Sequence, residues 1–225
     1  WGEYGPDMIA AQDGWNRGWL TLELGTKYLP SIPDVHARLQ ADPPARVADI
    51  ACGVGWAGIA IAQTYPKVEV VGYDLDRSSI EQARRYAQEA GVADRVSFQV
   101  ADVTQLKEAG QFDAAVIIEA VHDVARPVEF LAGARRLLRW GGTLIVADEK
   151  VANDFKAPGD FLERLFYGAS VLLCLPCGMS EQPSAATGAV MRTETLQRYA
   201  RQAGFSRIET LPLEHGSMRF YRLTP

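Results

Sequence analysis

Cysteine is scarce in this sequence, with only Cys52, Cys174 and Cys177 among 225 residues. Three cysteines are too few, and odd in number, for the disulfide framework of a small secreted domain, so a reducing cytoplasm is expected. Basic residues are also in the minority, because 23 Lys and Arg face 28 Asp and Glu, which gives a formal charge of −5. Gripping a phosphate backbone requires a basic surface, so we expect this portion of the chain not to contact nucleic acid.

Long uninterrupted apolar runs are absent. The longest candidates, 114–118 and 171–175, are far shorter than the ~20 residues that span a bilayer. No basic segment followed by an apolar one opens the chain, so neither a secretory signal nor a membrane contact is expected. The first residue is Trp1 rather than Met, and we expect the chain to begin partway into a longer gene product.

Short apolar segments alternate with segments of helical spacing through the middle of the chain. The apolar segments are 46–51, 68–74, 96–100, 112–119 and 143–148, and the helical ones are 56–64, 78–90 and 127–138. This alternation predicts an α/β fold of βαβ units, with a parallel sheet covered on both faces. Ser78 followed by Glu81 predicts a capping box at the start of the second of these helices, and Gly141–Gly142 predicts a break before the last strand.

The two flanks are organised differently. Residues 1–45 are rich in Trp, Tyr and Gly, and helices are expected around 13–26 and 33–40. Residues 150–192 form a long insertion, with a helix near 158–174 and then a loop rich in Gly, Ser and Pro, which is typical of a lid or a binding surface. A helix over 193–203 and an antiparallel hairpin of 206–212 with 218–223 complete the chain.

A glycine-rich turn follows the first expected strand. Gly53, Gly55 and Gly58 lie between that strand and a helix, where glycines let the backbone approach a ligand and the helix offers free N–H groups. The same spacing also fits the G-x-G-x-x-G motif of dinucleotide-binding proteins, so it does not by itself distinguish the two kinds of ligand.

Acidic residues at three strand ends favour a different cofactor. Asp49 precedes the glycines, where a carboxylate suits an ammonium group better than a pyrophosphate. Asp74 ends the second strand, where it can bind both ribose hydroxyls, and Asp102 follows the third, within reach of an adenine amino group or as the cap of the next turn. A nucleoside with a cationic tail meets all three, and S-adenosylmethionine is that molecule.

These residues and several further motifs resemble the class I S-adenosylmethionine-dependent methyltransferases over residues 45–225. The motifs run in order: Asp49-Ile-Ala-Cys-Gly-Val-Gly55, Gly72-Tyr-Asp74, Ala101-Asp102, Phe112-Asp113, Leu138-Arg-Trp-Gly-Gly142 and Ala203-Gly204-Phe205. The resemblance implies a Rossmann-like, mostly parallel sheet of seven strands in the order 3-2-1-4-5-7-6, with the last strand antiparallel and helices on both faces. It also implies S-adenosylmethionine as cofactor and S-adenosylhomocysteine as product.

Further segments are similar to a bacterial group of methyltransferases in which a small winged-helix-like module precedes the catalytic domain. They are 175–188, 32–39 and 212–215. On this resemblance the domain comprises residues 46–225, with 150–192 as its lid or substrate-binding insertion. Residues 1–45 are a helical segment that covers the cofactor site, where Tyr4, Trp15 and Trp19 either close over the sulfonium or pack a core.

The expected site lies at the carboxyl ends of the strands. The residues expected to bind the cofactor are Asp49, Ala51, Gly53, Gly55, Asp74, Leu75, Asp102, Val103 and Glu119, the last at the methionine end. The acceptor should face the segments after the later strands, which are 119–123, 148–150 and 214–215. His122 and His215 are the candidate catalytic bases there, whereas His36 is expected to be structural.

No metal site is expected. Cys174 and Cys177 form a C-x-x-C pair, but no second Cys or His pair lies at suitable spacing for zinc, so a structural role is favoured. The expected activity is direct in-line methyl transfer to a small molecule, and a homodimer is compatible with it. Two alternatives stay open: an NAD(P)-dependent oxidoreductase, and a cofactor-sensing regulator joined to an upstream DNA-binding module.

Overall fold

A seven-stranded sheet forms the centre of the computed structural model, which describes residues 4–225. Its strand order is β3-β2-β1-β4-β5-β7-β6, as expected. The strands are β1 (Arg46–Ile50), β2 (Glu69–Asp74), β3 (Val96–Val100), β4 (Phe112–Ile118), β5 (Leu138–Glu149), β6 (Arg207–Thr210) and β7 (Met218–Thr224). The first five are parallel neighbours, and β7 lies antiparallel to both β5 and β6.

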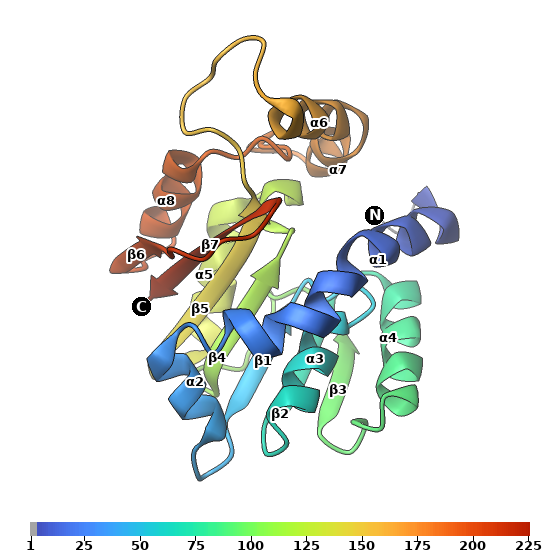
Figure 1. Ribbon diagram of the computed structural model, residues 1–225, viewed down its shortest axis with the longest axis vertical. Coiled ribbons are helices and arrows are strands. Elements are labelled where there is room, and N and C mark those ends of the chain that lie inside the picture. The colour runs from blue at the N-terminus through green and yellow to red at the C-terminus, as the bar shows by residue number, and fades with distance from the viewer. Residues whose placement is uncertain (1–3) are drawn as a thin grey trace.

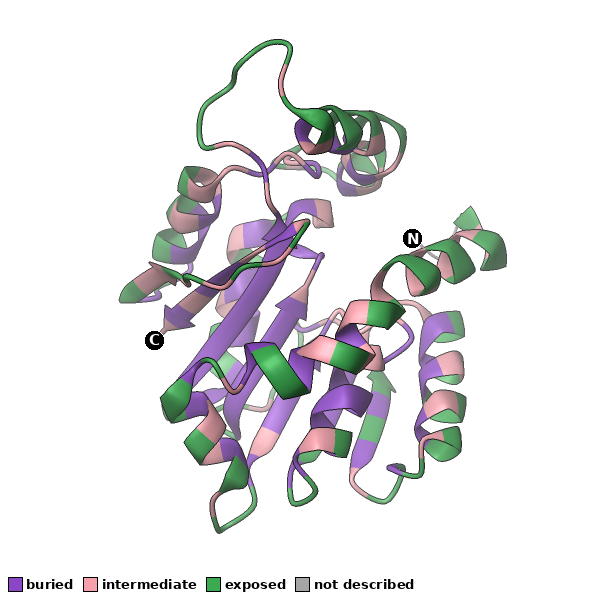
Figure 2. Cartoon of the chain, viewed as in Figure 1, coloured by how far each residue is buried: buried purple, intermediate pink, exposed green. Residues whose placement is uncertain are grey.

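Helices cover both faces of the sheet (Figure 1). The helices are α1 (Pro6–Trp19), α2 (Pro33–Gln40), α3 (Trp56–Thr64), α4 (Arg77–Glu89), α5 (Pro127–Leu137), α6 (Phe161–Ala169), α7 (Leu175–Met179) and α8 (Thr193–Gln202), with the π- and 3-10-helical segments η2 (Leu20–Tyr28), η3 (Val121–Asp123) and η4 (Ser170–Cys174). Residues of η2, α2, α3 and α4 build the core on one face, and residues of α5 and α8 build it on the other. The central strands are almost wholly buried between the two (Figure 2).

The N-terminal helix is longer than the sequence analysis expected. It begins at Pro6, a residue that suits a first helical turn, and continues from α1 directly into η2. η2 lies close against α3, because a Cβ at Gly25 would stand 2.1 Å from Thr64 Oγ1. Sequence periodicity does not report this packing of η2 against the neighbouring helix.

Two local predictions were wrong. The N-cap of α4 is Asp76 rather than Ser78, since its carboxylate accepts the N–H of Ser79 at 2.7 Å. The fifth strand does not begin after Gly141–Gly142 but runs through them from Leu138, with a register shift against β4 between Phe112 and Ala114. A bulge of this kind lets a strand continue through glycines that would otherwise indicate a turn.

The insertion after β5 lies above the carboxyl ends of the parallel strands, the end toward which the arrowheads of β3 and β4 point (Figure 1). Its helix is continuous over Phe161–Met179, 19 residues with a mean hydropathy of 1.3 in its most apolar window, and so passes a length-and-composition test for a membrane span. The helix expected near 158–174 thus begins at Phe161 and continues to Met179, into the segment expected to be a loop. The same test is passed by the core helices of soluble proteins, so this feature alone places nothing in a membrane.

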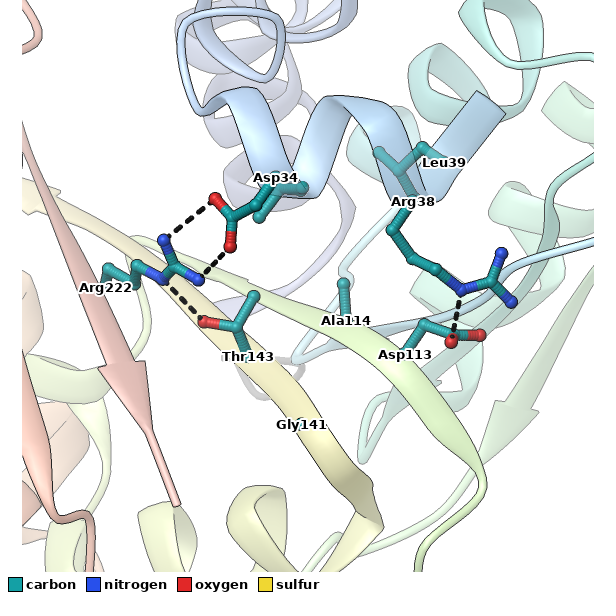
Figure 3. A pocket seen from close by; sticks show the side chains of 9 residues that line it. Asp34, Arg38, Leu39, Asp113, Ala114, Gly141, Thr143 and Arg222 are labelled. Carbon is teal, nitrogen blue, oxygen red and sulfur yellow. Dashed lines mark hydrogen bonds and ion pairs between the residues drawn. The ribbon is translucent and has the colours of Figure 1, made fainter. Parts of the chain in front are cut away.

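A small cavity lies at the opposite edge of the sheet, among the amino-terminal halves of β4 and β5, and has a volume of about 40 Å³. Figure 3 shows the ion pairs around it, with Arg38 donating to Asp113 at 2.7 Å and Arg222 paired with Asp34. These pairs hold α2 against the sheet. The cavity is therefore part of the scaffold, remote from the edge where ligands of parallel sheets bind.

Candidate functional site

Two glycines of the turn between β1 and α3, Gly53 and Gly55, have different structural roles, although both were expected to bind the cofactor. Gly53 and Gly55 both have positive φ, 52° and 87°, which favours glycine. A Cβ at Gly53 would meet nothing within 4 Å, whereas one at Gly55 would stand 2.5 Å from Cζ of Phe98. Gly53 therefore borders open space where a ligand can approach, and Gly55 makes room for a core side chain.

Phe98 of β3 also fixes Gly72 of β2, where a Cβ would lie 2.3 Å from the ring. The phenyl ring thus packs beneath the turn from the neighbouring strand. Gly55 and Gly72 therefore make room for the Phe98 ring in the core, whereas Gly53 leaves space on the solvent side of the turn.

Asp49 at the end of β1 is buried, and its Oδ2 accepts the N–H of Gly58 in the first turn of α3 at 2.8 Å. Burial raises the pKa of this carboxyl to about 7, because the single backbone hydrogen bond offsets only part of the lost hydration. A cationic ligand group nearby would favour its charged form. Asp49 thus accepts a hydrogen bond from the first turn of α3 and can also pair with a cationic ligand group.

Asp74 at the end of β2 faces the same turn. Its Oδ2 accepts the N–H of Gly53 at 2.7 Å, and its Oδ1 accepts the N–H of Asp76 at 2.9 Å. Burial raises the pKa of Asp74 despite these hydrogen bonds. Both oxygens are thus held in place by backbone amides and keep lone pairs for two further donors.

Four further residues expected to bind the cofactor differ in exposure. Leu75 is 67% exposed beside Asp74, and Asp102 accepts the N–H of Thr104 at 2.8 Å, which makes it the cap of its own turn. Val103 is buried, and its side chain belongs to the core on the α5 face. Ala51 has a positive φ of 55° at the start of the glycine turn. Of these four, Leu75 alone offers a mainly exposed apolar side chain.

Glu119 follows β4 with a positive φ of 50° and is covered by α1. Three side chains of that helix donate to its carboxylate: Gln12 at 2.9 Å, Trp15 at 3.2 Å, and Asn16. Burial nevertheless raises the pKa of Glu119. The N-terminal helix therefore reaches the same end of the sheet as the glycine turn, and Gln12 and Asn16 are site residues that the sequence analysis missed.

A second contact ties α1 to α3 and α4. Asp13 accepts from Trp56 Nε1 at 2.5 Å and from the Tyr86 hydroxyl at 3.2 Å, and the Arg17 guanidinium lies 4.3 Å from the Trp56 ring centroid. Trp56 and Tyr86 are themselves stacked, with centroids 4.6 Å apart. No motif in the sequence links residues 43 and 73 positions apart, so only the fold reveals this contact.

His122 in η3 is 2% exposed and lies among carboxylates from two strand ends. Its Nδ1 is 2.7 Å from Asp148 Oδ1 and 2.9 Å from Glu149 Oε2, both at the end of β5. Its Nε2 is 3.2 Å from Asp123 Oδ1. The structure thus brings the two segments 119–123 and 148–150 together, as expected of neighbouring parallel strands.

The carboxylates govern the charge of this cluster. Burial opposes a charged imidazole, yet Asp148, Glu149 and Asp123 raise the pKa of His122 well above its ordinary value. Burial raises the pKa of Glu149 well above its ordinary value, whereas the contact with His122 lowers that of Asp148 despite its burial. A protonated imidazole accepts no further proton, so His122 can serve as a base only after it has released its own.

The insertion closes over His122. Gly188 donates its N–H to the His122 carbonyl at 3.1 Å, and Ala185 donates to the Ala125 carbonyl at 2.8 Å.

Among the residues the structure describes, two groups could hold a metal ion: His122 with Asp123 and Cys174, and His122 with Asp148 and Glu149. Cys174 is a buried free thiol in this structure.

His215 is not part of this cluster. Its Nδ1 accepts the N–H groups of Ser217 and Met218 at 3.1 and 2.9 Å, and its ring packs 5.0 Å from that of Trp19. Burial lowers its pKa. His36 contacts the Tyr65 hydroxyl at 2.8 Å.

The mostly parallel sheet, with the order β3-β2-β1-β4-β5-β7-β6 and helices on both faces, is a Rossmann-like fold. The model of the methyltransferase-domain family matches residues 41–202. The chain therefore belongs to the methyltransferase-domain family, and the expected resemblance and fold are confirmed.

Similar proteins agree with this assignment. The chain is 32% identical over 129 residues to the O-methyltransferase resE of Aspergillus sclerotiorum, covering 57% of this chain and 48% of that protein. It is 32% identical over 139 residues to trans-aconitate 2-methyltransferase of Streptomyces coelicolor, covering 62% and 43%. A solved SAM-dependent methyltransferase from Aquifex aeolicus superposes with a TM-score of 0.69 at 15% identity, covering 97% of each chain. The chain spans about half the length of the curated relatives it matches.

Proposed function

We propose that this chain transfers the methyl group of S-adenosylmethionine to a small-molecule acceptor by direct in-line displacement. The acceptor atom attacks the sulfonium methyl, the carbon–sulfur bond breaks, and S-adenosylhomocysteine leaves. Holding donor and acceptor in line can supply several kcal/mol of the rate enhancement without covalent participation of the protein.

The observation that carries this proposal is the arrangement of Asp74 beside Gly53. Backbone amides orient the carboxylate toward a turn with free space above it, which suits a ribose diol better than a phosphate. In this proposal Asp74 binds the ribose, Leu75, Asp102 and Val103 lie around the adenine, and Asp49, Ala51, Gly53 and Gly55 surround the methionine tail. Glu119 and α1 cover the tail from above.

On the acceptor side, the proposal places the transferred methyl near His122. That residue, with Asp148 and Glu149, lies after the two strands that adjoin the switch in strand order, where ligands of such sheets bind. We assign to this cluster the removal of the acceptor's proton where the acceptor is a hydroxyl or an amine. His215 is the second candidate, and its contacts favour a structural role.

The wider setting is proposed on the same basis. A reducing, cytoplasmic location in a bacterium fits the small and odd number of cysteines, and the acidic charge argues against nucleic acid as a partner of this portion. A homodimer is compatible with the proposal. Residues 1–45 are assigned as the cover of the cofactor site and 150–192 as the lid over the acceptor.

Isothermal titration tests the proposal against its alternative. S-adenosylhomocysteine should bind with one-to-one stoichiometry, while NADH and NADPH should give no binding heat. The reverse result would make the chain an oxidoreductase in spite of its family. Binding of S-adenosylhomocysteine without methyl transfer to any acceptor would instead favour a sensing role for the whole protein.

A further inference from the structure

Asp148 and Glu149 lie buried beside a single cationic side chain, that of His122. Asp148 is 1% exposed and Glu149 6%, and within residues 4–225 neither forms an ion pair with a lysine or arginine. His122 is their shared cationic partner. A buried carboxylate without a compensating charge is strongly unfavourable.

A single imidazolium leaves this cluster incompletely satisfied. One Nδ1–H can donate one good hydrogen bond, and it donates to Asp148 Oδ1 at 2.7 Å. Asp148 Oδ2 and Glu149 Oε2 are buried and accept no hydrogen bond, although Oε2 lies 2.9 Å from the Nδ1 that donates to Asp148. Orphaned oxygens at this depth are rare in folded proteins and call for a ligand that the chain itself does not supply.

The spacing of the three groups fits a metal ion. Nδ1 of His122 and oxygens of Asp148 and Glu149 lie within 4.8 Å of one another. Ligands about 2.1 Å from an ion and at right angles to each other stand roughly 3.0 Å apart. The separations of Nδ1 from the two carboxylate oxygens, 2.7 and 2.9 Å, are close to that value, so small side-chain shifts would admit the ion.

We propose that His122, Asp148 and Glu149 bind a divalent first-row transition-metal ion through Nδ1 and one oxygen of each carboxylate. The ion takes the place of the shared proton, and its two positive charges match the two carboxylates. One imidazole with two carboxylates is a mixed donor set that suits Mn²⁺ or Zn²⁺ better than Mg²⁺, which prefers oxygen alone.

The role of this ion rests on the proposed function. Three protein ligands leave coordination positions open, and these lie at the ends of β4 and β5 where the acceptor is proposed to bind. An acceptor oxygen on the ion would lose its proton more readily and be held toward the sulfonium. The substrate class implied is an acceptor with a hydroxyl or carboxylate oxygen able to coordinate a metal.

The test uses Mn²⁺ and Zn²⁺ as probes on the whole chain after removal of bound metal with EDTA. Isothermal titration, and the loss of the free Mn²⁺ signal in electron paramagnetic resonance, should report one ion per chain. Mg²⁺ should bind at least about tenfold more weakly than Mn²⁺. Asp148→Asn and Glu149→Gln should each weaken Mn²⁺ binding by at least about tenfold, since even outer partners of metal ligands are worth that much.

Asp94→Asn is the matched control, because Asp94 is an exposed carboxylate whose ion-pair partner within residues 4–225 is its neighbour Arg95, and this variant should bind Mn²⁺ like the wild type. Circular dichroism checks that each variant folds, and Glu149→Gln is the near-isosteric choice if Asp148→Asn does not. No one-to-one binding by the wild type, or equal binding in both ligand variants, would overturn the metal site. S-adenosylhomocysteine titrated into the same metal-free protein keeps the two proposals distinguishable, because it should bind whether or not the ion does.

Discussion

Gly53 donates its backbone N–H to Oδ2 of Asp74 across the first two strand ends, at 2.7 Å. This hydrogen bond joins the turn that opens toward a ligand with the carboxylate proposed to bind it. The two residues are 21 positions apart, yet the parallel pairing of β1 with β2 places them at one edge. Any ligand seated on the turn meets the carboxylate in a fixed orientation.

Asp74→Ala should weaken S-adenosylhomocysteine binding by about ten- to a hundredfold, the value of a charge-assisted pair of hydrogen bonds of ~1.5–3 kcal/mol. Isothermal titration measures the change, and circular dichroism should be unaltered. Asp76→Ala is the matched control, since it removes the N-cap of α4 and should lower stability by ~1 kcal/mol with little effect on binding. Unaltered binding by Asp74→Ala would show that the nucleoside lies elsewhere.

The raised pKa of Asp49, about 7, predicts a pH dependence of both stability and binding. A carboxyl with a higher pKa in the folded state stabilises the protein below about pH 4, and that contribution is lost as the pH rises to about 7. A cationic cofactor tail beside it should lower the pKa, so binding near pH 6.5 should release a proton. Titration in buffers of different ionisation enthalpy detects that proton, and Asp49→Asn should abolish it. Binding heats independent of the buffer in the wild type would contradict the placement.

Gly55→Ala and Gly53→Ala should differ in the free energy of unfolding. Both place a side chain at positive φ, at ~1–2 kcal/mol, but a Cβ at Gly55 also meets Phe98 at 2.5 Å, and overpacking adds ~1–3 kcal/mol. Urea denaturation should therefore show the larger loss of unfolding free energy for Gly55→Ala. Isothermal titration with S-adenosylhomocysteine should show the larger loss of cofactor affinity for Gly53→Ala, because Gly53 borders the open space of the turn. Equal destabilisation would mean that Phe98 moves aside freely.

The lid prediction concerns residues 175–190, which contain few large apolar side chains. Gly188 donates its N–H to His122 in η3, and Ala185 donates to Ala125 just after it. Their amides should exchange quickly in the free protein and slow down when S-adenosylhomocysteine and an acceptor are bound. Hydrogen-exchange mass spectrometry measures this, with α8 as an internal reference that should not change. Slow exchange in both states would show that the segment is a rigid part of the fold and does not act as a lid.

His122→Ala should lower the single-turnover rate of methyl transfer by roughly a hundredfold, with cofactor affinity nearly intact. His215→Ala is the matched comparison, because its ring packs against Trp19 and Tyr28, and it should lose stability more than rate. If the His122 variant retained a rate within a few-fold of wild type once an acceptor is known, the role would pass to His215 or to no residue.

Sequence reasoning predicted the α/β class from local periodicity and the acidic strand ends from the residues that follow the apolar segments, while the strand order came from the resemblance to class I methyltransferases. It could not find Gln12 and Asn16, which reach Glu119 only because α1 lies beside the end of β4 in the folded chain. Nor could it separate Gly53 from Gly55, since that difference depends on Phe98 arriving from another strand. The contact of His122 with Asp148 and Glu149 likewise exists only once β4 and β5 lie side by side.

A crystal structure of the chain with S-adenosylhomocysteine tests the central claim most directly. The account predicts both ribose hydroxyls within hydrogen-bond distance of Asp74, the adenine beside Leu75 and Asp102, and the sulfur directed toward Glu119 and His122. A ligand bound outside the glycine turn, or a ribose with no contact to Asp74, would contradict it.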